Sequence, residues 1–211
     1  KRSGARMSLK VLILAFDGME ALDFAGPFEV FTTAARMAKR MGIGDDPWCT
    51  VHCVAATDAP VVARAGLRVL PDFSFSKLAS HDALPADILV IPGGVVDGAL
   101  NCPATLSWIA AHTATAGITA SVCTGAFLLA GAGVMTNQRV TTHWEDISDL
   151  QKAWPKLDVV GDVRWVDNGR TITSAGISAG IDMSLHLVER LGGRALAERT
   201  ARQMDFTWTH N

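Results

Sequence analysis

The stretch GITASVCTGAFLLAGAGV, residues 117–134, contains a complete strand–turn–helix unit. The small and apolar residues from Gly117 to Val122 predict a buried strand, and a helical pattern begins at Thr124 and runs to Gly133. One residue, Cys123, lies between the two elements. This arrangement is typical of a nucleophile elbow, here with cysteine in place of the usual serine.

A thiol at this position faces the backbone amides and the positive end of the helix dipole, which favour an anion. Helix N-termini can lower a cysteine pKa from about 8.5 into a range of about 3.5–7.5. We therefore expect Cys123 to be largely thiolate at neutral pH. The spacing alone is equally compatible with a buried cysteine that simply fits the turn.

Outward from this unit, short apolar runs alternate with helical patterns along the chain. The expected strands are Val11–Phe16, Cys49–Ala55, Ile88–Ile91, Gly117–Val122 and Arg170–Thr173. The expected helices are Phe24–Met41, Pro103–Ala116 with Asn101 as its cap, Thr124–Gly133, Glu145–Trp154, Ile177–Leu191 and Gly193–Asp205. The alternation predicts one α/β domain, a doubly wound, mostly parallel sheet with helices on both faces. Two local hairpins are added, Val61–Ala63 with Leu67–Leu70 and Val163–Val166 with Arg170–Thr173.

Composition narrows the possible partners and compartments. The chain has 211 residues, 49% of them hydrophobic, which suits a single domain with a sizeable core. A formal net charge of -2 argues against nucleic acid as a partner, and no apolar run approaches the roughly 20 residues of a membrane span. The run 11–16 is also too short for a signal peptide. We expect a cytoplasmic protein, with residues 1–8 as a tag or disordered N-terminus and residues 9–208 as the domain.

The four cysteines do not suggest a disulfide framework in a domain of this size. Cys49, His52 and Cys53 are close enough in sequence to raise the question of a metal site. However, the segment from Trp48 to Ala55 is predicted as a strand, which places the two cysteines on one face and the histidine on the other. We therefore expect buried core cysteines and no metal.

Two further segments lie where expected strands end, which is where such sheets bind ligands. Gly93 and Gly94 follow the strand that ends at Ile91, and their amides could join that of Thr124 in an oxyanion hole; a plain turn is the alternative. Three acids, Asp17, Glu20 and Asp23, follow the first strand. A carboxyl beside a thiolate would have a raised pKa and could act as a general acid, but composition does not choose among the three.

Five motifs, in order, resemble the ThiJ/PfpI superfamily, which has the flavodoxin-like fold of the class I glutamine amidotransferases. They are Leu22-Asp23 with Gly26-Pro27, Pro92-Gly93-Gly94, SVCTGAFLLAGAGV (121–134), TTHW (141–144) and TSAGISAGIDMSLHLVE (173–189). The resemblance spans roughly residues 9–208. It implies that Asp23 is the acid that faces the nucleophile Cys123.

The residue after the cysteine refines the resemblance. Protease-like members have histidine there, whereas this chain has Thr124, which argues against a Cys-His dyad and peptidase activity. Cys-Thr-Gly with a first-loop aspartate is similar to the isocyanide hydratase branch, and also to the ligand-sensing half of AraC-type transcription regulators. We expect Gly125, His143 and Ile177 to contribute to substrate binding. A role for His143 as a helix-start residue bonded to backbone is equally compatible with its position.

The resemblance implies a hydratase in which Cys123 attacks the terminal carbon of a small isocyanide and forms a thioimidate-like adduct. Asp23 would transfer protons, with Thr124 completing the catalytic group, and hydrolysis would release an N-formamide. No cofactor is required, because a nucleophile and an acid suffice. The expected partners are a small-molecule substrate and, from the family, a second copy in a homodimer.

Two alternatives remain. The chain could be the sensor domain of a regulator, although it ends at Asn211 and so leaves no room for a helix-turn-helix module. It could also be a glyoxalase-like or redox-responsive stress protein that uses the same cysteine.

Overall fold

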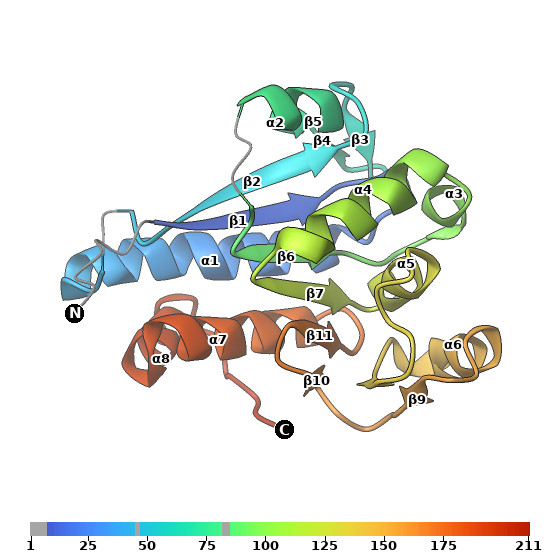
Figure 1. The fold of residues 1–211 in the computed structure, drawn as a ribbon. Helices are drawn as coiled ribbons and strands as arrows, with labels where there is room; N and C mark the ends of the chain where they lie inside the picture. Colours follow the sequence, from blue (N-terminus) through green and yellow to red (C-terminus); the bar gives the residue numbers. More distant parts are fainter. Residues whose placement is uncertain (1–7, 45–46, 82–84) are drawn as a thin grey trace, which may run out of the picture.

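A seven-stranded sheet forms the centre of the protein (Figure 1). The computed structural model describes residues 8–44, 47–81 and 85–211, so residues 1–7 of the expected N-terminal extension lie outside it. In spatial order the strands are β10 (Trp165–Asp167), β11 (Thr171–Ser174), β7 (Ile118–Val122), β6 (Ile88–Ile91), β1 (Leu9–Leu14), β2 (Cys49–Ala55) and β5 (Phe73–Ser74). Within this sheet β10 is antiparallel to its neighbour, and the other pairs are parallel.

The helices cover both faces of the sheet. Across the sheet, the step from β1 to β2 and the step from β6 to β7 run in opposite directions. Because both crossovers are right-handed, the connecting helices lie on opposite faces of the sheet. Figure 1 shows α7 and α8 beside α1, with α4 and α5 away from them across the strands. The bounds are α1 (Ala21–Met41), α4 (Pro103–Thr115), α5 (Gly125–Gly131), α7 (Ala179–Gly192) and α8 (Arg194–Gln203).

The core follows from the composition of the strands. Every residue of β1, β6 and β7 is buried, as expected for parallel strands with helices on both sides. Helix α1 packs against β1 and β2 on one side and buries Phe24, Phe31 and Ala38. The predicted doubly wound α/β fold is confirmed.

Both predicted hairpins are present, although their strands are short. β3 (Val61–Val62) pairs antiparallel with β4 (Arg68–Val69), and β10 pairs antiparallel with β11. Several short elements were not predicted, because few residues carry their pattern. These are α2 (Phe75–His81), α3 (Asp97–Leu100), β8 (Arg139–Val140) and β9 (Asp158–Val159), besides the edge strand β5.

Two predicted helix details differ from the structure. The cap of α4 is Cys102 rather than Asn101, whose side-chain amide instead donates to the carbonyl of Asp97, the first residue of α3. The helix expected over Glu145–Trp154 is divided into η1 (Trp144–Asp146), a 3₁₀ turn, and α6 (Ile147–Ala153). Short 3₁₀ turns of this kind are common at the N-termini of α-helices.

Cys49 and Cys53 are buried on β2, and the Cys49 thiol lies 3.3 Å from the carbonyl oxygen of Phe31. The His52 ring instead packs against Phe73, with a centroid separation of 5.4 Å. Within the described part of the chain, no three His, Cys, Asp or Glu side chains are grouped as metal ligands would be. No helix in that part has the length and apolar character needed to cross a bilayer.

The sheet has one topological switch point, between β1 and β6, where the chain reverses its direction of winding. Ligands bind beside such points, beyond the carboxyl ends of the strands. The loops that follow β1, β6, β7 and β11 meet there, and they contain the residues of the candidate site.

Candidate active site

Cys123 directly follows the last residue of β7, and its backbone has a φ of 56°, a region that residues with a Cβ seldom adopt. Its N–H is shared between the carbonyls of Ser174 and Ala175, at 3.2 and 3.3 Å. Its own carbonyl accepts a 2.8 Å hydrogen bond from the Thr142 hydroxyl. The surroundings thus impose a strained conformation, which proteins concentrate at functional sites. The predicted strand–turn–helix unit is confirmed.

Glycines let the loop after β6 approach this turn backbone to backbone. A Cβ on Gly125 would lie 2.2 Å from the Ile91 carbonyl oxygen, and a Cβ on Gly93 would lie 2.5 Å from the Thr124 nitrogen. Neither neighbour is a flexible side chain that could move away. The Pro-Gly-Gly and Cys-Thr-Gly motifs are therefore two halves of one contact.

The three candidate acids have different surroundings. Asp17 is exposed and accepts the Val62 N–H at 2.8 Å, so it fastens the β3–β4 hairpin. Glu20 lies on the wall of a cavity and pairs with Arg64 at 3.4 Å. Asp23, in the first turn of α1, is fully buried and interacts with Cys123.

One oxygen of Asp23 accepts a backbone hydrogen bond, and the carboxyl also interacts with the Cys123 thiol. Its Oδ2 accepts the Gly93 N–H at 3.0 Å, whereas Oδ1 is buried and makes no hydrogen bond of normal geometry to a described residue. Burial raises the pKa of Asp23 to about 7; the bond from Gly93 opposes the rise, Glu20 adds to it, and Cys123 lowers it by hydrogen bonding. The raised pKa matches the prediction in direction, but its main cause is desolvation and not a neighbouring thiolate.

The thiol of Cys123 is also mostly buried, with 6% of the residue exposed. Burial, reinforced by the Asp23 carboxylate, raises its pKa to about 12, against the opposing N–H groups of Thr124 and Ile177. The expectation of a thiolate at neutral pH is therefore wrong for the resting site, because desolvation outweighs the effect of the helix start. The two groups titrate as a coupled pair that resists carrying two negative charges.

Of the amides expected near the sulfur, that of Thr124 is there, but those of Gly93 and Gly94 are not. The Gly94 N–H donates to the Thr124 hydroxyl at 2.8 Å, and this hydroxyl donates back to the Gly94 carbonyl at 2.9 Å. The Gly93 N–H is taken by Asp23. The N–H groups of Gly93 and Gly94 are thus both engaged in hydrogen bonds, whereas we expected them to be free oxyanion donors. The N–H groups directed at the sulfur belong to Thr124 and Ile177.

Cys123 opens into a cavity of about 560 Å³, large enough for a small organic molecule. Gly94, Thr124, His143 and Ile177 share its wall, so the structure brings these predicted residues to one place. Gly125 is not on this wall, and its contribution is the close packing against β6.

His143 combines the two roles open to it from the sequence. It lines the cavity, and its Nδ1 also accepts the Glu145 N–H at 3.3 Å at the start of η1. The same nitrogen lies 3.4 Å from Asp146 Oδ2. Gly176 makes room for the ring, because a Cβ there would lie 2.1 Å from His143 Cδ2.

Sequence reasoning missed Thr142 and Arg64, besides other residues of the cavity wall. Thr142, which holds the Cys123 carbonyl, stands inside the TTHW motif, and the motif was its only signal. Arg64 reaches the cavity from the β3–β4 hairpin, and no local pattern marks it.

Comparisons with known proteins agree with this geometry. A sequence model described as the DJ-1/PfpI family matches residues 9–190. The chain is 32% identical over 203 residues to the isonitrile hydratase of Pseudomonas putida, covering 95% of this chain and 79% of that protein. It is 29% identical over 197 residues to the HTH-type transcriptional regulator CdhR of Pseudomonas aeruginosa, covering 93% of this chain and 55% of the regulator.

Among solved structures, a ThiJ/PfpI family protein from Pseudomonas syringae superposes with a TM-score of 0.79 at 26% identity, over 94% of this chain and 75% of that one. The family match covers nearly all the strands and helices that build the site, from β1 into α7. The chain belongs to the DJ-1/PfpI family.

Proposed function

We propose that this protein is a cysteine-dependent hydratase that converts small isocyanides to N-formamides, with Cys123 as nucleophile and Asp23 as general acid and base. One observation carries the proposal: a fully buried carboxyl with a pKa of about 7 interacts with a cysteine held at a strained turn beside a cavity. A group that titrates near neutral pH is suited to both accepting and donating a proton. The 32% identity to an isonitrile hydratase supports the choice of reaction.

The proposed reaction balances without a cofactor. The Asp23 carboxylate takes the thiol proton as sulfur forms a bond to the terminal isocyanide carbon. Protonated Asp23 then delivers that proton to the same carbon, which gives a thioimidate. Water adds to this carbon, the C–S bond breaks, and the nitrogen is protonated, so that an N-formamide and the thiol remain.

Neighbouring residues have supporting roles in this scheme. The N–H groups of Thr124 and Ile177 stabilise negative charge as it develops on sulfur. The Thr124 hydroxyl, bound twice by Gly94, positions the elbow rather than exchanging protons. The Gly93 N–H occupies Oδ2 of Asp23, so Oδ1 is the oxygen left to accept the thiol proton.

A second candidate, a small-molecule sensor domain of an AraC-type regulator, is supported by the similarity to CdhR. In that case the same cavity would bind a ligand without turnover. We retain two further proposals from the family resemblance and the cysteine usage, a homodimer and a cytoplasmic location.

The test is formamide production, followed by NMR, from alkyl and aryl isocyanides. Wild type is expected to turn over, and Cys123→Ala to lose at least about 10³-fold in kcat/KM. Cys102→Ser serves as the control, because Cys102 lies outside the site at the start of α4. Background signal from wild type with every isocyanide would exclude the hydratase and favour the sensor.

A further inference from the structure

The loop between β11 and α7 supplies one of the two N–H groups that are directed at the Cys123 sulfur. This donor belongs to Ile177, whose backbone has a φ of 28°. A β-branched residue avoids positive φ more strongly than most others, so this conformation is strained. Strain of this kind persists only where the surrounding structure imposes it. Contacts from outside the loop must therefore keep the Ile177 N–H in place.

Arg164, which precedes β10, contacts this loop on both sides of Ile177. Its carbonyl accepts the Ala175 N–H at 2.9 Å, and its Nη2 donates to the Ser178 hydroxyl at 3.3 Å. Ala175 is also bonded to the elbow, because its carbonyl accepts the Cys123 N–H at 3.3 Å. Arg164 thus connects the two ends of the strained segment to each other.

The guanidinium of Arg164 is fixed by Asp182, in the first turn of α7. Both Nε, at 2.9 Å, and Nη2 donate to Asp182 Oδ2, and the Asp182 side chain is 0% exposed. Its Oδ1 accepts the Thr209 N–H at 2.7 Å, so both oxygens of this carboxylate are engaged. A buried carboxylate is costly unless it is paired and hydrogen-bonded. A well-satisfied buried ion pair therefore holds Arg164 beside the loop.

We propose that Arg164 and Asp182 are positioning residues of the active site, which hold the Ile177 N–H against the Cys123 sulfur. Neither residue lines the cavity into which Cys123 opens, so the pair acts through the loop and not on a substrate. The effect of the pair on turnover rests on the hydratase function, because the Ile177 N–H would stabilise charge on sulfur during the attack. The effect on the thiol itself requires no substrate.

Arg164→Lys tests this role, because lysine keeps the positive charge but cannot hold Asp182 and Ser178 with one planar fork. The measurement is alkylation of Cys123 by iodoacetamide at pH 8, followed by mass spectrometry of the peptide that contains it. The rate is expected to fall at least about 5-fold, because the reactive thiolate loses the hydrogen bond from Ile177. A purely structural role would instead loosen the loop and expose the sulfur, which would leave the rate unchanged or increase it.

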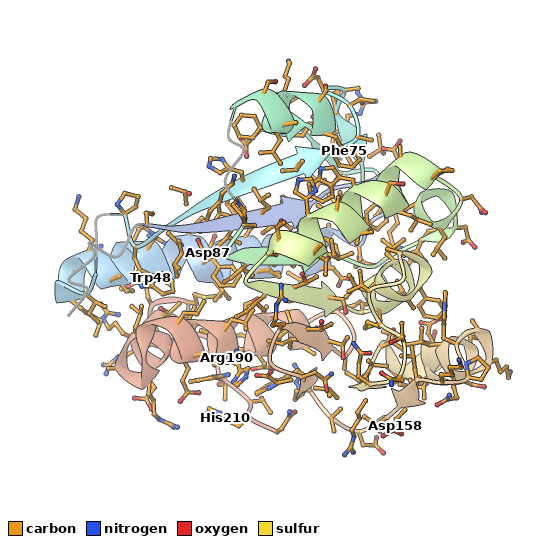
Figure 2. All side chains as sticks on the ribbon, in the orientation of Figure 1. Trp48, Phe75, Asp87, Asp158, Arg190 and His210 are labelled. Carbon is orange, nitrogen blue, oxygen red and sulfur yellow. The ribbon has the colours of Figure 1, made fainter. Side chains whose placement is uncertain are left out.

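Arg190→Lys is the matched control. Arg190 lies in the last turn of α7 (Figure 2), and its side chain is 32% exposed, as is that of Arg164. It also pairs with an aspartate, Asp167, at 3.0 Å, and its other hydrogen bonds go to the Gly169 carbonyl, away from the loop. The control is expected to lose some stability in urea unfolding and to leave the alkylation rate of Cys123 unchanged.

Ser178→Ala is a milder variant, because the Ser178 side chain is exposed and its truncation should not prevent folding. It removes only the hydrogen bond from Arg164 to the residue after Ile177. Alkylation of Cys123 is expected to slow about 2-fold to 3-fold. If Arg164→Lys does not fold, Ser178→Ala decides alone.

Turnover separates this proposal from the hydratase function. With an isocyanide that wild type converts, Arg164→Lys is expected to lower kcat at least about 10-fold with little change in KM, since the Ile177 N–H acts on the transition state. If no isocyanide reacts but alkylation slows in the Arg164 and Ser178 variants alone, the hydratase function fails and the positioning role stands. If isocyanides react and alkylation does not slow in either variant, the positioning role is overturned and the hydratase function stands. Equal slowing in Arg190→Lys would also overturn the positioning role.

Discussion

Asp23 and Cys123 each change the acidity of the other across the carboxyl ends of β1 and β7. The thiol lowers the pKa of the carboxyl by hydrogen bonding, and the carboxylate raises the pKa of the thiol. Both groups are buried, so either proton can leave only if the remaining charge is stabilised within the site. The pair therefore favours transfer of a proton between its members and a substrate over release of that proton to water.

The pH dependence of stability should reveal the buried acid. The pKa of Asp23 is about 7 in the folded state, compared with an ordinary value of 3.8, so the folded protein binds this proton more tightly than the unfolded chain does. Stability is therefore expected to fall as pH rises from about 4 to about 7. Asp23→Asn, which cannot ionise, should be more stable than wild type at pH 8 by on the order of 2–4 kcal/mol, and similar to it near pH 4.

Urea unfolding of both proteins at pH 4, 6 and 8 measures this difference. Asp17→Asn is the control, because that side chain is exposed and an amide can still accept the Val62 N–H. Parallel stability curves for wild type and Asp23→Asn would contradict a raised pKa at Asp23.

The pH profile of kcat/KM should have one rising limb, which is set by the titration of Asp23. If the Asp23 carboxylate accepts the thiol proton, kcat/KM should increase about 10-fold per pH unit below about 7 and level off above it. Burial raises the thiol pKa to about 12, so no further change is expected up to pH 9. A profile that keeps rising between pH 7 and 9 would instead indicate titration of the thiol itself.

The strained turn depends on Thr142. Thr142→Val keeps the size of the side chain but removes the 2.8 Å hydrogen bond to the Cys123 carbonyl. The Cys123 carbonyl then keeps only the 3.4 Å hydrogen bond from the Ala126 N–H, and a lost hydrogen bond of this kind costs about 0.5–1.5 kcal/mol of folding free energy. We expect that loss in urea unfolding, together with at least about a 10-fold lower kcat/KM, because the elbow is no longer held in place. Thr142→Ser retains the hydroxyl and should recover most of both; failure of this recovery would contradict the role of the hydrogen bond.

The position of His143 depends on the absence of a side chain at Gly176. A Cβ at residue 176 would lie 2.1 Å from His143 Cδ2, so Gly176→Ala should displace the ring from the cavity wall. We expect KM to rise about 10-fold with little change in kcat, because binding and not chemistry is affected. In a His143→Ala background the same substitution should have much less effect, as a double-mutant cycle would show. Additive effects of the two substitutions would mean that Gly176 acts through another neighbour.

Much of the architecture could be predicted from local pattern. The run at 88–91 is continuous and apolar and the run at 49–55 is mostly apolar, and both strands have the predicted bounds. The boundaries of α1 and α7 were displaced by a few residues, because helix ends depend on capping contacts as well as on periodicity. Asn101 was misassigned for the same reason, because its side chain donates instead to the carbonyl of Asp97, the first residue of α3.

The site was predictable in part in its membership but less so in its chemistry. The order of residues around Cys123 and the family motifs indicated the proposed nucleophile, the proposed acid and a minority of the residues on the cavity wall. The occupied amides of Gly93 and Gly94 were not foreseeable, because their partners, Asp23 and Thr124, come from other loops. Arg64 likewise reaches the cavity only through the folding of a hairpin that is distant in the chain.

The amino-acid sequence by itself determined the alternation of strands and helices, the small residues at the close approaches, and the one cysteine at the end of a central strand. These features depend on near neighbours in the chain, so the local pattern carries them. Only the tertiary structure decided the protonation of the Asp23–Cys123 pair. The physical reason is that desolvation and Coulomb interactions depend on distance in space and on what excludes water, and both arise only when the loops meet at the edge of the sheet.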